Sequence, residues 1–369
     1  MGVSSRQKIE VSAGHPYPVF LGANLEDLGD YMLSRFGNIE QALIITQPVV
    51  AKHYADRVRQ GFKGCRVDLV TVSAGEGEKS LARLSALVGE AVRLGADRLT
   101  LVVALGGGVI GDLAGFFAGV FMRGIRFVQV PTTLLAMVDS SIGGKVAVNH
   151  PAGKNLLGAF YPPLAVWTDF STLASLPWQE VQNGLAETVK HAVLGDPDLF
   201  AFLEEHLSKI LERDPLILRE LTARSLAVKV RLVSQDEREQ GVRALLNLGH
   251  SFGHALETAT EYEGISHGRG VSVGLVAASR LAEERGLIAG ADVQRIMNLL
   301  SGLGLPISVR GLEAGRLVQL MAADKKNRFG RKVLILPRGI GQAVQVEDCS
   351  DEDLRRAWAG VIDSNFPIS

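Results

Sequence analysis

The sequence has 369 residues, enough for two domains, and its 47% hydrophobic and 21% charged residues are typical of a folded globular protein. Its formal net charge of −1 excludes a chain built as a whole to attract nucleic acid or an anionic membrane, so any anion site needs a local basic cluster. The two cysteines, Cys65 and Cys349, show neither metal-ligand spacing nor a disulfide framework, which predicts a reducing, cytoplasmic location.

The first 170 residues or so alternate short apolar runs with stretches of helical spacing. Strands are expected at Ala42–Thr46, Arg66–Val72, Leu99–Leu105, Arg126–Val130 and Leu164–Trp167, and helices at 48–60 and 80–94. Strands that alternate with helices favour a mostly parallel α/β sheet.

One stretch is long and apolar enough to be mistaken for a membrane span. From Leu99 to Met122 the only charged residue before Arg123 is Asp112, and that length can cross a bilayer. Three consecutive glycines at 106–108 interrupt it, and Leu99–Leu105 is rich in β-forming residues. We therefore expect a strand, a glycine turn and a buried helix, with no contact to a membrane.

The second half of the chain has a different character. From about Leu176 to Leu300 strand signals nearly vanish, and helices are expected at Trp178–Leu194, Pro215–Ser234 and Val271–Arg285. A late run, Lys332–Leu336, could form one strand. We predict an α/β domain over 1–175 and an otherwise all-α domain over 176–369.

A glycine-rich turn follows the strand at Leu99–Leu105. Gly106, Gly108 and Gly111 fit G-x-G-x-x-G at a strand-to-helix junction, where the helix N-terminus favours a phosphate. The next strand, Phe127–Pro131, ends without the acidic residue that a Rossmann fingerprint places against a ribose. The turn indicates nucleotide or phosphate binding, and the alternative is a tight structural turn.

Polar residues in glycine-rich loops follow these strands. They are Thr132 and Thr133, the loop Asp139–Lys145, and Gly153-Lys154-Asn155. Open α/β sheets bind ligands at the carboxyl ends of their strands, so these loops favour a ligand site there.

Histidines in the helical half indicate a metal. His250 and His254 lie four apart, His267 follows between Ser and Gly, and Glu187 lies three residues before Lys190. One carboxylate with two histidines is typical of a catalytic zinc site. By spacing alone, His250 and His254 are the natural pair. The alternative is that each histidine only forms hydrogen bonds in a packed core.

Several basic residues flank glycine, asparagine or apolar helical positions: Lys145, Lys154, Lys190, Lys229, Arg243 and the pair Lys325-Lys326. Arg243 opens the apolar run 244–248. A guanidinium at the edge of a buried helix favours a carboxylate or phosphate partner.

Five segments strongly resemble the 3-dehydroquinate synthase family: Leu105–Asp112, Phe127–Asn149, Gly153–Tyr161, Gly184–Lys190 and Asp236–Glu257. This resemblance implies a Rossmann-like NAD-binding N-terminal domain and a helical, metal-binding C-terminal domain, with the active site between them. The family is related in architecture to iron-type alcohol and glycerol dehydrogenases.

The resemblance also implies roles for individual residues. The metal ligands become Glu187, His250 and His267, so His254 becomes a substrate contact, against the spacing argument. The NAD contacts are Glu76, Lys79, Gly107, Gly108, Val109, Ile110, Gly111, Asp112, Thr132, Thr133, Lys145, Lys154 and Thr172. The substrate contacts are Asp139, Lys145, Asn155, Lys190, Lys229, Glu239, Arg243, Asn247, His254 and either Lys325 or Lys326. Arg123 resembles an arginine that reaches the partner subunit's site, which implies a homodimer.

The implied activity is that of a phosphate-eliminating carbon–oxygen lyase that uses NAD and a divalent metal, zinc or cobalt. Its substrate would be a phosphorylated sugar acid, 3-deoxy-D-arabino-heptulosonate 7-phosphate. Transient oxidation by NAD, loss of phosphate, re-reduction and an intramolecular aldol step would give 3-dehydroquinate, in the shikimate pathway to aromatic amino acids.

Three alternatives stay open. They are another sugar-phosphate cyclase, a metal-dependent alcohol or glycerol dehydrogenase, and a catalytically inactive nucleotide-binding protein. The chain also departs from the family at Arg269, where a glutamate is usual. A cation in the first turn of a helix opposes the helix dipole by roughly 0.3–1 kcal/mol.

Overall fold

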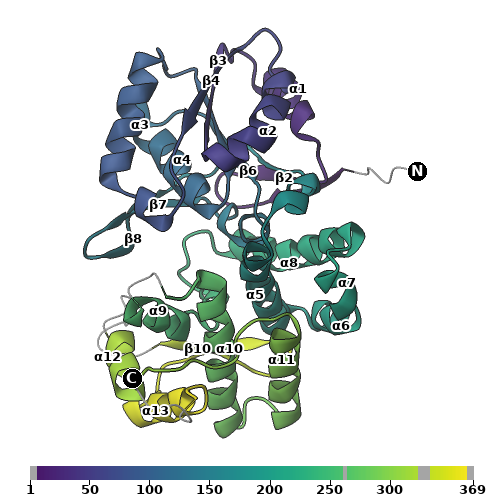
Figure 1. Cartoon of the computed structure of the whole chain (residues 1–369), viewed down its shortest axis with the longest axis vertical. Helices are drawn as coiled ribbons and strands as arrows, with labels where there is room; N and C mark the ends of the chain where they lie inside the picture. The colour runs from purple at the N-terminus through teal and green to yellow at the C-terminus, as the bar shows by residue number, and fades with distance from the viewer. Residues whose placement is uncertain (1–5, 261–263, 323–332, 364–369) are drawn as a thin grey trace. The chain divides into compact units, whose positions relative to one another are not determined.

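The computed structural model describes residues 6–260, 264–322 and 333–363. The chain divides into two compact units, which are coloured along the chain in Figure 1. Unit 1 comprises Met1–Pro177 and Val233–Arg238, and unit 2 comprises Trp178–Leu232 and Glu239–Ser369. Among the described residues, no helix is long and apolar enough to cross a membrane.

Unit 1 is built on a seven-stranded sheet in the order β1-β2-β9-β6-β5-β3-β4. Its strands are β1 (Gln7–Val11), β2 (Tyr17–Leu21), β3 (Gln41–Thr46), β4 (Arg66–Thr71), β5 (Leu101–Gly106), β6 (Phe127–Pro131) and β9 (Val166–Thr168). Only β1 and β2 pair antiparallel, and the other neighbours pair in parallel. The predicted parallel α/β sheet is confirmed.

The helices of unit 1 cover both faces of this sheet (Figure 1). They are α1 (Leu28–Phe36), α2 (Pro48–Gly61), α3 (Leu81–Arg93) and α4 (Gly108–Val120). Leu43 and Ile45 belong to the core that includes α3 and α4, whereas Ala42 and Ile44 belong to the core that includes α1 and α2. Successive strand residues point to opposite faces, so a strand covered on both faces is apolar throughout.

The five strands and two helices predicted for this part are present, with ends shifted by a residue or two. Strands β1 and β2 were not predicted. The stretch Leu99–Met122 folds as β5, the glycine turn, α4 and the short turn η3 (Phe121–Arg123), as expected. Helix α4 is buried because Leu113, Ala114 and Phe117 pack into the unit 1 core.

A hairpin replaces part of the predicted glycine-rich loops. Strands β7 (Lys145–His150) and β8 (Gly153–Phe160) pair antiparallel, so the loop prediction for Lys145 and for Gly153-Lys154-Asn155 was wrong. Val146 and Val148 belong to the same core as α4, and this contact holds the hairpin against the rest of unit 1. Asp139 lies in a short π-helical turn, η4 (Ala136–Ser140).

Unit 2 is mainly helical. Its helices are α5 (Trp178–Gly195), α6 (Pro197–Glu205), α7 (Leu207–Leu211), α8 (Pro215–Gln235), α9 (His250–Ala259), α10 (His267–Glu284), α11 (Gly290–Gly302), α12 (Ala314–Ala322) and α13 (Asp351–Ala359). The three predicted helices correspond to α5, α8 and α10, but α10 begins at His267, earlier than Val271. The late strand is β10 (Leu334–Pro337), and it pairs with an unpredicted β11 (Ala343–Val346), so the unit is not entirely α-helical.

Candidate active site

Three helices of unit 2 approach one another closely because glycines face backbone. A Cβ atom on Gly268 of α10 would lie 2.4 Å from the Cα of Asn183 on α5. A Cβ on Gly274 would lie 2.1 Å from the carbonyl oxygen of Gly249, which precedes α9. Any larger side chain would push these helices apart. Gly268 thus lets the start of α10 lie against α5, and Gly274 lets the start of α9 lie against α10.

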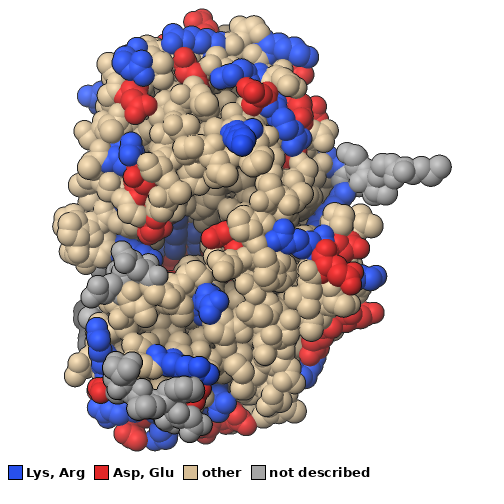
Figure 2. Space-filling model, viewed as in Figure 1, with Lys and Arg blue, Asp and Glu red and all other residues tan. Residues whose placement is uncertain are grey.

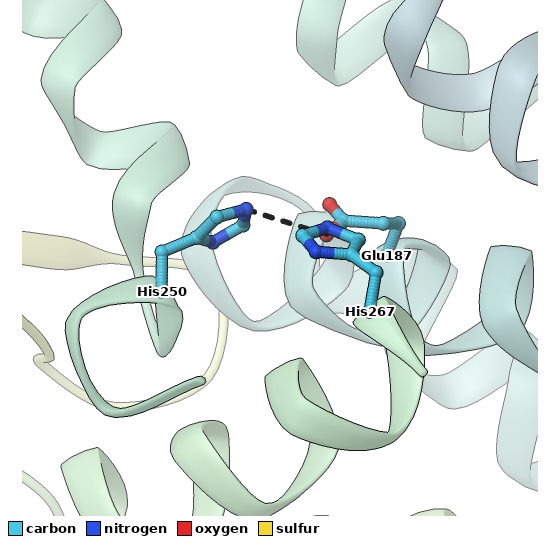
Figure 3. Close-up of side chains that lie close together, drawn as sticks. All are labelled: Glu187, His250 and His267. Carbon is cyan, nitrogen blue, oxygen red and sulfur yellow. Dashed lines mark ion pairs between the residues drawn. The ribbon is translucent and has the colours of Figure 1, made fainter. Parts of the chain in front are cut away.

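Glu187, His250 and His267 meet at this junction (Figure 3). Glu187 Oε1 lies 3.3 Å from His267 Nε2 and 3.6 Å from His250 Nε2. One possible ligand atom from each residue lies within 4.8 Å of the others. His254 is not part of this group, although its ring lies 5.5 Å from that of His250. The partner of His250 at the carboxylate is therefore His267, not the histidine four residues away.

The second nitrogen of each imidazole has a partner of its own. His267 Nδ1 lies 2.9 Å from Glu257 Oε1, and His250 Nδ1 lies 3.3 Å from the carbonyl oxygen of Leu248. An imidazole that donates from Nδ1 carries its lone pair on Nε2, the atom that faces Glu187. In the neutral form that a metal ligand requires, both rings would offer an Nε2 lone pair beside the same carboxylate.

This arrangement fits a divalent metal. Glu187 is completely buried, and neither of its oxygens accepts a hydrogen bond of ordinary geometry from the described residues. A buried carboxylate normally has such donors, since its desolvation is otherwise expensive. Its neighbours are the two imidazole Nε2 atoms and the ammonium of Lys190, with which it forms an ion pair. One carboxylate oxygen with two imidazole nitrogens is the donor set of a catalytic zinc site with an open position.

The charges of the group shift its pKa values in different directions. Burial opposes ionisation of Glu187, but Lys190 and the two imidazoles outweigh it and hold the Glu187 pKa well below its usual value. Burial and the Lys190 charge lower the pKa of His250 well below its usual value. For His267, burial lowers the pKa, but the neighbouring carboxylates of Glu187 and Glu257 outweigh burial and raise the pKa to about 10.

Unit 2 also buries three basic side chains. Lys190, Lys229 and Arg243 are 1%, 6% and 2% exposed, and η6 (Val242–Asn247), which carries Arg243, packs against α5. Near Arg243, the Asn247 amide donates to Glu239 Oε1 at 2.5 Å. Three basic side chains in one helical unit offer an anionic ligand charge-assisted hydrogen bonds.

In unit 1, the glycine turn between β5 and α4 contacts the end of β6. A Cβ on Gly107 would lie 3.0 Å from Thr133, and one on Gly111 would lie 2.8 Å from Gln129 Oε1. The small residues therefore let the predicted threonines lie beside the start of α4, where backbone N–H groups favour phosphate. Ile110 is fully buried in the core of unit 1.

Four predicted residues of unit 1 form one polar network. The Lys79 ammonium lies 2.8 Å from Asp112 Oδ2, 2.7 Å from Asn155 Oδ1 and 3.4 Å from Glu76 Oε1. Burial lowers the pKa of Lys79, but Asp112 and Glu76 outweigh it, so the net shift is upward. Burial raises the pKa of Asp112 more than Lys79 lowers it.

The remaining predicted residues are placed as follows. Thr132 and Thr172 are buried, and the Thr172 hydroxyl donates to the carbonyl of Asp169 at 2.8 Å. Lys145 and Lys154 lie near the starts of β7 and β8. Arg123 and its neighbour Met122 both have left-handed backbones, with φ of 71° and 49°. Lys325 and Lys326 lie outside the described residues.

Sequence reasoning missed two residues that contact the predicted site. Glu257 lies seven residues, two helical turns, after His250, and this spacing could have placed it on the same helix face. Asn149 bonds to Glu76 and Asn155, and no local pattern indicated it. On the face drawn in Figure 2, basic and acidic side chains are interspersed, and that face shows no continuous basic patch.

Two family models match adjoining parts of the chain. Residues 69–183 match the 3-dehydroquinate synthase N-terminal model, and residues 184–327 match the 3-dehydroquinate synthase C-terminal model. A 3-dehydroquinate synthase of Desulforamulus reducens is 43% identical over 351 residues, which cover 94% of this chain and 98% of that protein. One of Pelobacter propionicus is 45% identical over 327 residues, 88% of this chain and 91% of that protein.

Solved structures give the same fold. The 2-epi-5-epi-valiolone synthase of Streptomyces hygroscopicus, with NAD+ and Zn2+ bound, is 28% identical with a TM-score of 0.85, over 98% of this chain and 99% of that one. A 2-deoxy-scyllo-inosose synthase with carbaglucose-6-phosphate, NAD+ and Co2+ is 27% identical with a TM-score of 0.85, over 97% and 100%. An iron-containing alcohol dehydrogenase, 18% identical over 97% and 99% with a TM-score of 0.67, shares the fold alone.

Proposed function

We propose that this chain, which belongs to the 3-dehydroquinate synthase family, converts 3-deoxy-D-arabino-heptulosonate 7-phosphate into 3-dehydroquinate and inorganic phosphate. The structural observation that carries the proposal is the meeting of Glu187, His250 and His267 in a unit that also buries three basic side chains. A metal-ligand group among buried cations suits a substrate that carries both hydroxyls and two acidic groups. Such a substrate is a phosphorylated sugar acid.

The cofactors of the proposed reaction are NAD and a divalent metal, zinc or cobalt. Support comes from the two cyclase structures described with NAD+ and with Zn2+ or Co2+, and from the donor set in unit 2. When bound, the metal would acidify a substrate hydroxyl, and NAD would accept and later return one hydride. Glu187, His250 and His267 would hold the metal. The contacts of NAD would include Glu76, Lys79 and the start of α4.

The basic side chains of unit 2 would bind the two acidic groups of the substrate. We assign the carboxylate to Arg243 and Lys229, because a guanidinium binds a carboxylate through two parallel hydrogen bonds. We assign the phosphate to the remaining cations together with Asn155, Asn247 and His254, whose side chains suit its oxygens. Neutralising the phosphate also makes it a better leaving group.

Other residues would orient groups or move protons. His254 can give or take a proton at its imidazole, the side chain that most often serves as a general acid or base. Asp139, Lys145, Lys190 and Glu239 complete the proposed set of substrate contacts. Lys190 has a further effect, since its ammonium next to Glu187 keeps that carboxylate ionised and able to bind a metal.

The rival activity, that of an alcohol or glycerol dehydrogenase, shares the fold but has little support from the site. A dehydrogenase for a neutral alcohol needs no buried cations beyond those that hold its cofactor, whereas this chain buries Lys190, Lys229 and Arg243 in its helical unit. Relatives at 43–45% identity are named 3-dehydroquinate synthases, and the dehydrogenase is only 18% identical.

We also propose a cytoplasmic homodimer in which Arg123 serves the partner subunit. Val120, Met122 and Phe160 are apolar yet 39–44% exposed, and they flank Arg123 and Tyr161. Tyr161 joins these segments, since its hydroxyl donates to the carbonyl of Ile125 at 2.7 Å. A second copy of the chain could cover this apolar surface. Cys65 and Cys349 do not form a disulfide with each other, which suits a reducing compartment.

One assay tests the proposed activity. The purified protein is incubated with the heptulosonate phosphate, NAD and a divalent metal, and phosphate and dehydroquinate are measured together. Equal amounts of both products are expected. The matched control is Glu187→Gln, which keeps the size of the side chain but loses a charged ligand and should abolish turnover. Product formation by this variant after treatment with a chelator would contradict the metal assignment.

A further inference from the structure

Asn149 lies where the β7–β8 hairpin departs from regular pairing. The register of the two strands shifts between Val148 and His150, so Asn149 occupies a bulge. The backbone of Asn149 forms a parallel bridge with Ser80, and its backbone N–H donates to the carbonyl oxygen of Lys79 at 2.7 Å. Bulges re-aim a side chain and are frequent beside active sites. This bulge fastens the hairpin to the turn that follows β4.

The side chain of Asn149 uses its donor and its acceptor on different partners. Its Nδ2 donates to Glu76 Oε1 at 2.8 Å, and its Oδ1 accepts from the backbone N–H of Asn155 at 2.9 Å. A reversed amide would place oxygen against the Glu76 carboxylate and NH2 against the Asn155 N–H, so the orientation is unambiguous. Neither an aliphatic side chain nor a carboxylate can form both bonds.

These bonds close a ring of contacts. Asn155 has φ of 52°, in the left-handed region, and its Oδ1 accepts from Lys79 Nζ at 2.7 Å. Lys79 Nζ lies 3.4 Å from Glu76 Oε1, the oxygen that Asn149 also contacts. The ring therefore runs from Asn149 to Glu76, Lys79, Asn155 and back to Asn149. Because Lys79 is 4% exposed, the ring has little freedom to rearrange when one contact is lost.

We propose that Asn149 is a positioning residue that holds Glu76 and Asn155 in place through two separate hydrogen bonds, and so serves NAD binding and substrate binding at once. The inference rests on the proposed function, which gives Glu76 to NAD and Asn155 to the substrate. Asn149 needs to touch neither ligand. Its Nδ2 aims the carboxylate that faces the nucleotide, and its Oδ1 holds the strained backbone from which the Asn155 side chain projects.

Two substitutions separate these two contacts. Asn149→Ala removes both, so the dissociation constant of NAD and the KM for the heptulosonate phosphate should each rise roughly ten-fold, with a smaller change in kcat. Asn149→Asp keeps the acceptor for the Asn155 N–H but places a carboxylate against Glu76. Its NAD dissociation constant should rise at least as much, whereas its KM should stay within about two-fold of the unchanged protein. A residue that only stabilised the fold would not raise the dissociation constant of NAD while leaving the KM almost unchanged.

The measurements use the full chain. NAD is titrated against the protein by fluorescence, KM and kcat are determined at saturating NAD and metal, and hydrogen exchange follows the hairpin amides without ligand. The matched control is Asn298→Ala. Asn298 is exposed on α11, and its side-chain oxygen accepts a hydrogen bond from the side chain of Gln294 at 2.8 Å, far along the chain from the hairpin. It should leave all three measurements unchanged.

Faster exchange of the hairpin amides in Asn149→Ala is expected even before any ligand is added. The inference is overturned if Asn149→Ala changes only one of the two constants, or if exchange of the hairpin is unaffected. If Asn149→Ala does not fold, Asn149→Asp alone decides, since equal effects on both constants would also overturn it. A failure of the proposed function looks different, because the unchanged protein would then not consume the sugar acid, and the inference would fall with it.

Discussion

Glu257 Oε1 lies 2.9 Å from Nδ1 of His267, so a buried carboxylate on α9 fixes the first side chain of α10. Glu257 is 3% exposed, and burial makes such a charge-assisted hydrogen bond stronger than it would be in water. The bond directs His267 Nε2 toward Glu187, 3.3 Å away. Metal affinity should therefore depend on a residue that does not itself bind the metal.

Replacing Glu257 tests this dependence. Glu257→Ala removes the partner of His267 and should weaken metal binding about 10–100-fold, whereas Glu257→Gln keeps an acceptor oxygen and should lose less. Competition with a chelator, followed by calorimetry on metal-free protein, measures the affinity without using activity. Glu283→Gln, on the exposed face of α10, serves as the control. Unchanged affinity in Glu257→Ala would remove Glu257 from the metal site.

The proposed homodimer predicts complementation between two inactive subunits. Arg123→Ala should impair the partner's site, and His250→Ala should impair the site of its own subunit. When the two variants are co-expressed, half of randomly formed dimers are mixed and have one intact site, so about a quarter of full activity should return. Light scattering measures whether the protein is a monomer or a dimer. An active monomer, or no recovery of activity in the mixed sample, would rule out a shared site.

Stability at acidic pH should depend on Asp353. It belongs to the capping box of α13 with Ser350, and it also lies 3.0 Å from Arg285 and 2.5 Å from Arg356. A backbone hydrogen bond at Ser350, opposed by burial and assisted by the Ser350 hydroxyl and Arg285, lowers the pKa of Asp353 to about 2. Because this pKa lies below that of the unfolded chain, the stabilisation is complete above about pH 4 and is lost as pH falls toward about 2.

The variant Asp353→Ala isolates that contribution. It should lower the free energy of unfolding by about 1–2 kcal/mol near neutral pH, the usual effect of losing a helix cap with modest ion pairs. Urea unfolding at several pH values measures it, and the difference from the unchanged protein should shrink only below about pH 4. Glu352→Ala is the control, since its pair with Arg355 is long, at 3.5 Å, and exposed. A difference that stays constant into acid would contradict the assignment.

NAD should cycle without net reduction. The proposed reaction converts its substrate to phosphate and an isomerised carbon skeleton with no overall oxidation, so the hydride removed must be returned. During complete conversion of the heptulosonate phosphate, NADH absorbance should not grow in proportion to product. Accumulation of one NADH for each substrate consumed would instead support the dehydrogenase alternative.

Local patterns predicted the α/β part well because both faces of its sheet are covered. The run Leu101–Leu105 is buried throughout, so its continuous apolar sequence predicts a strand of a covered sheet, and the three glycines mark its end. The hairpin of β7 and β8 was missed for the opposite reason. Only Val146–Val148 of β7 are buried, β8 has no fully buried residue, and the glycines and lysines of the hairpin are equally typical of a loop.

The metal-ligand group shows what spacing cannot predict. His250 and His254 are four apart on one helix, yet the nitrogen that meets Glu187 beside His250 belongs to His267 on another helix. That approach depends on Gly268 and Gly274, whose missing side chains let α10 lie against neighbouring backbone. The family resemblance predicted His267 because a family's motif includes residues that meet only in the folded protein. Helical periodicity describes the contacts of one helix at a time. Nothing in the structure explains Arg269.

The proposed substrate carries a carboxylate as well as a phosphate. Arg243, 2% exposed, is the proposed carboxylate partner, and such a contact contributes roughly 1.5–3 kcal/mol. A sugar phosphate without the carboxylate could not form this contact. Arg243→Ala should therefore raise the KM for the sugar acid without changing the dissociation constant of NAD.

The most direct measurement compares the kcat/KM values of two substrates on the unchanged protein. One substrate is the heptulosonate phosphate, which has a carboxylate, and the other is sedoheptulose 7-phosphate, which has none. We predict that the sugar acid is strongly preferred, since only the sugar acid can form the charge-assisted contact between its carboxylate and Arg243. Equal or faster turnover of sedoheptulose 7-phosphate would contradict the dehydroquinate synthase activity.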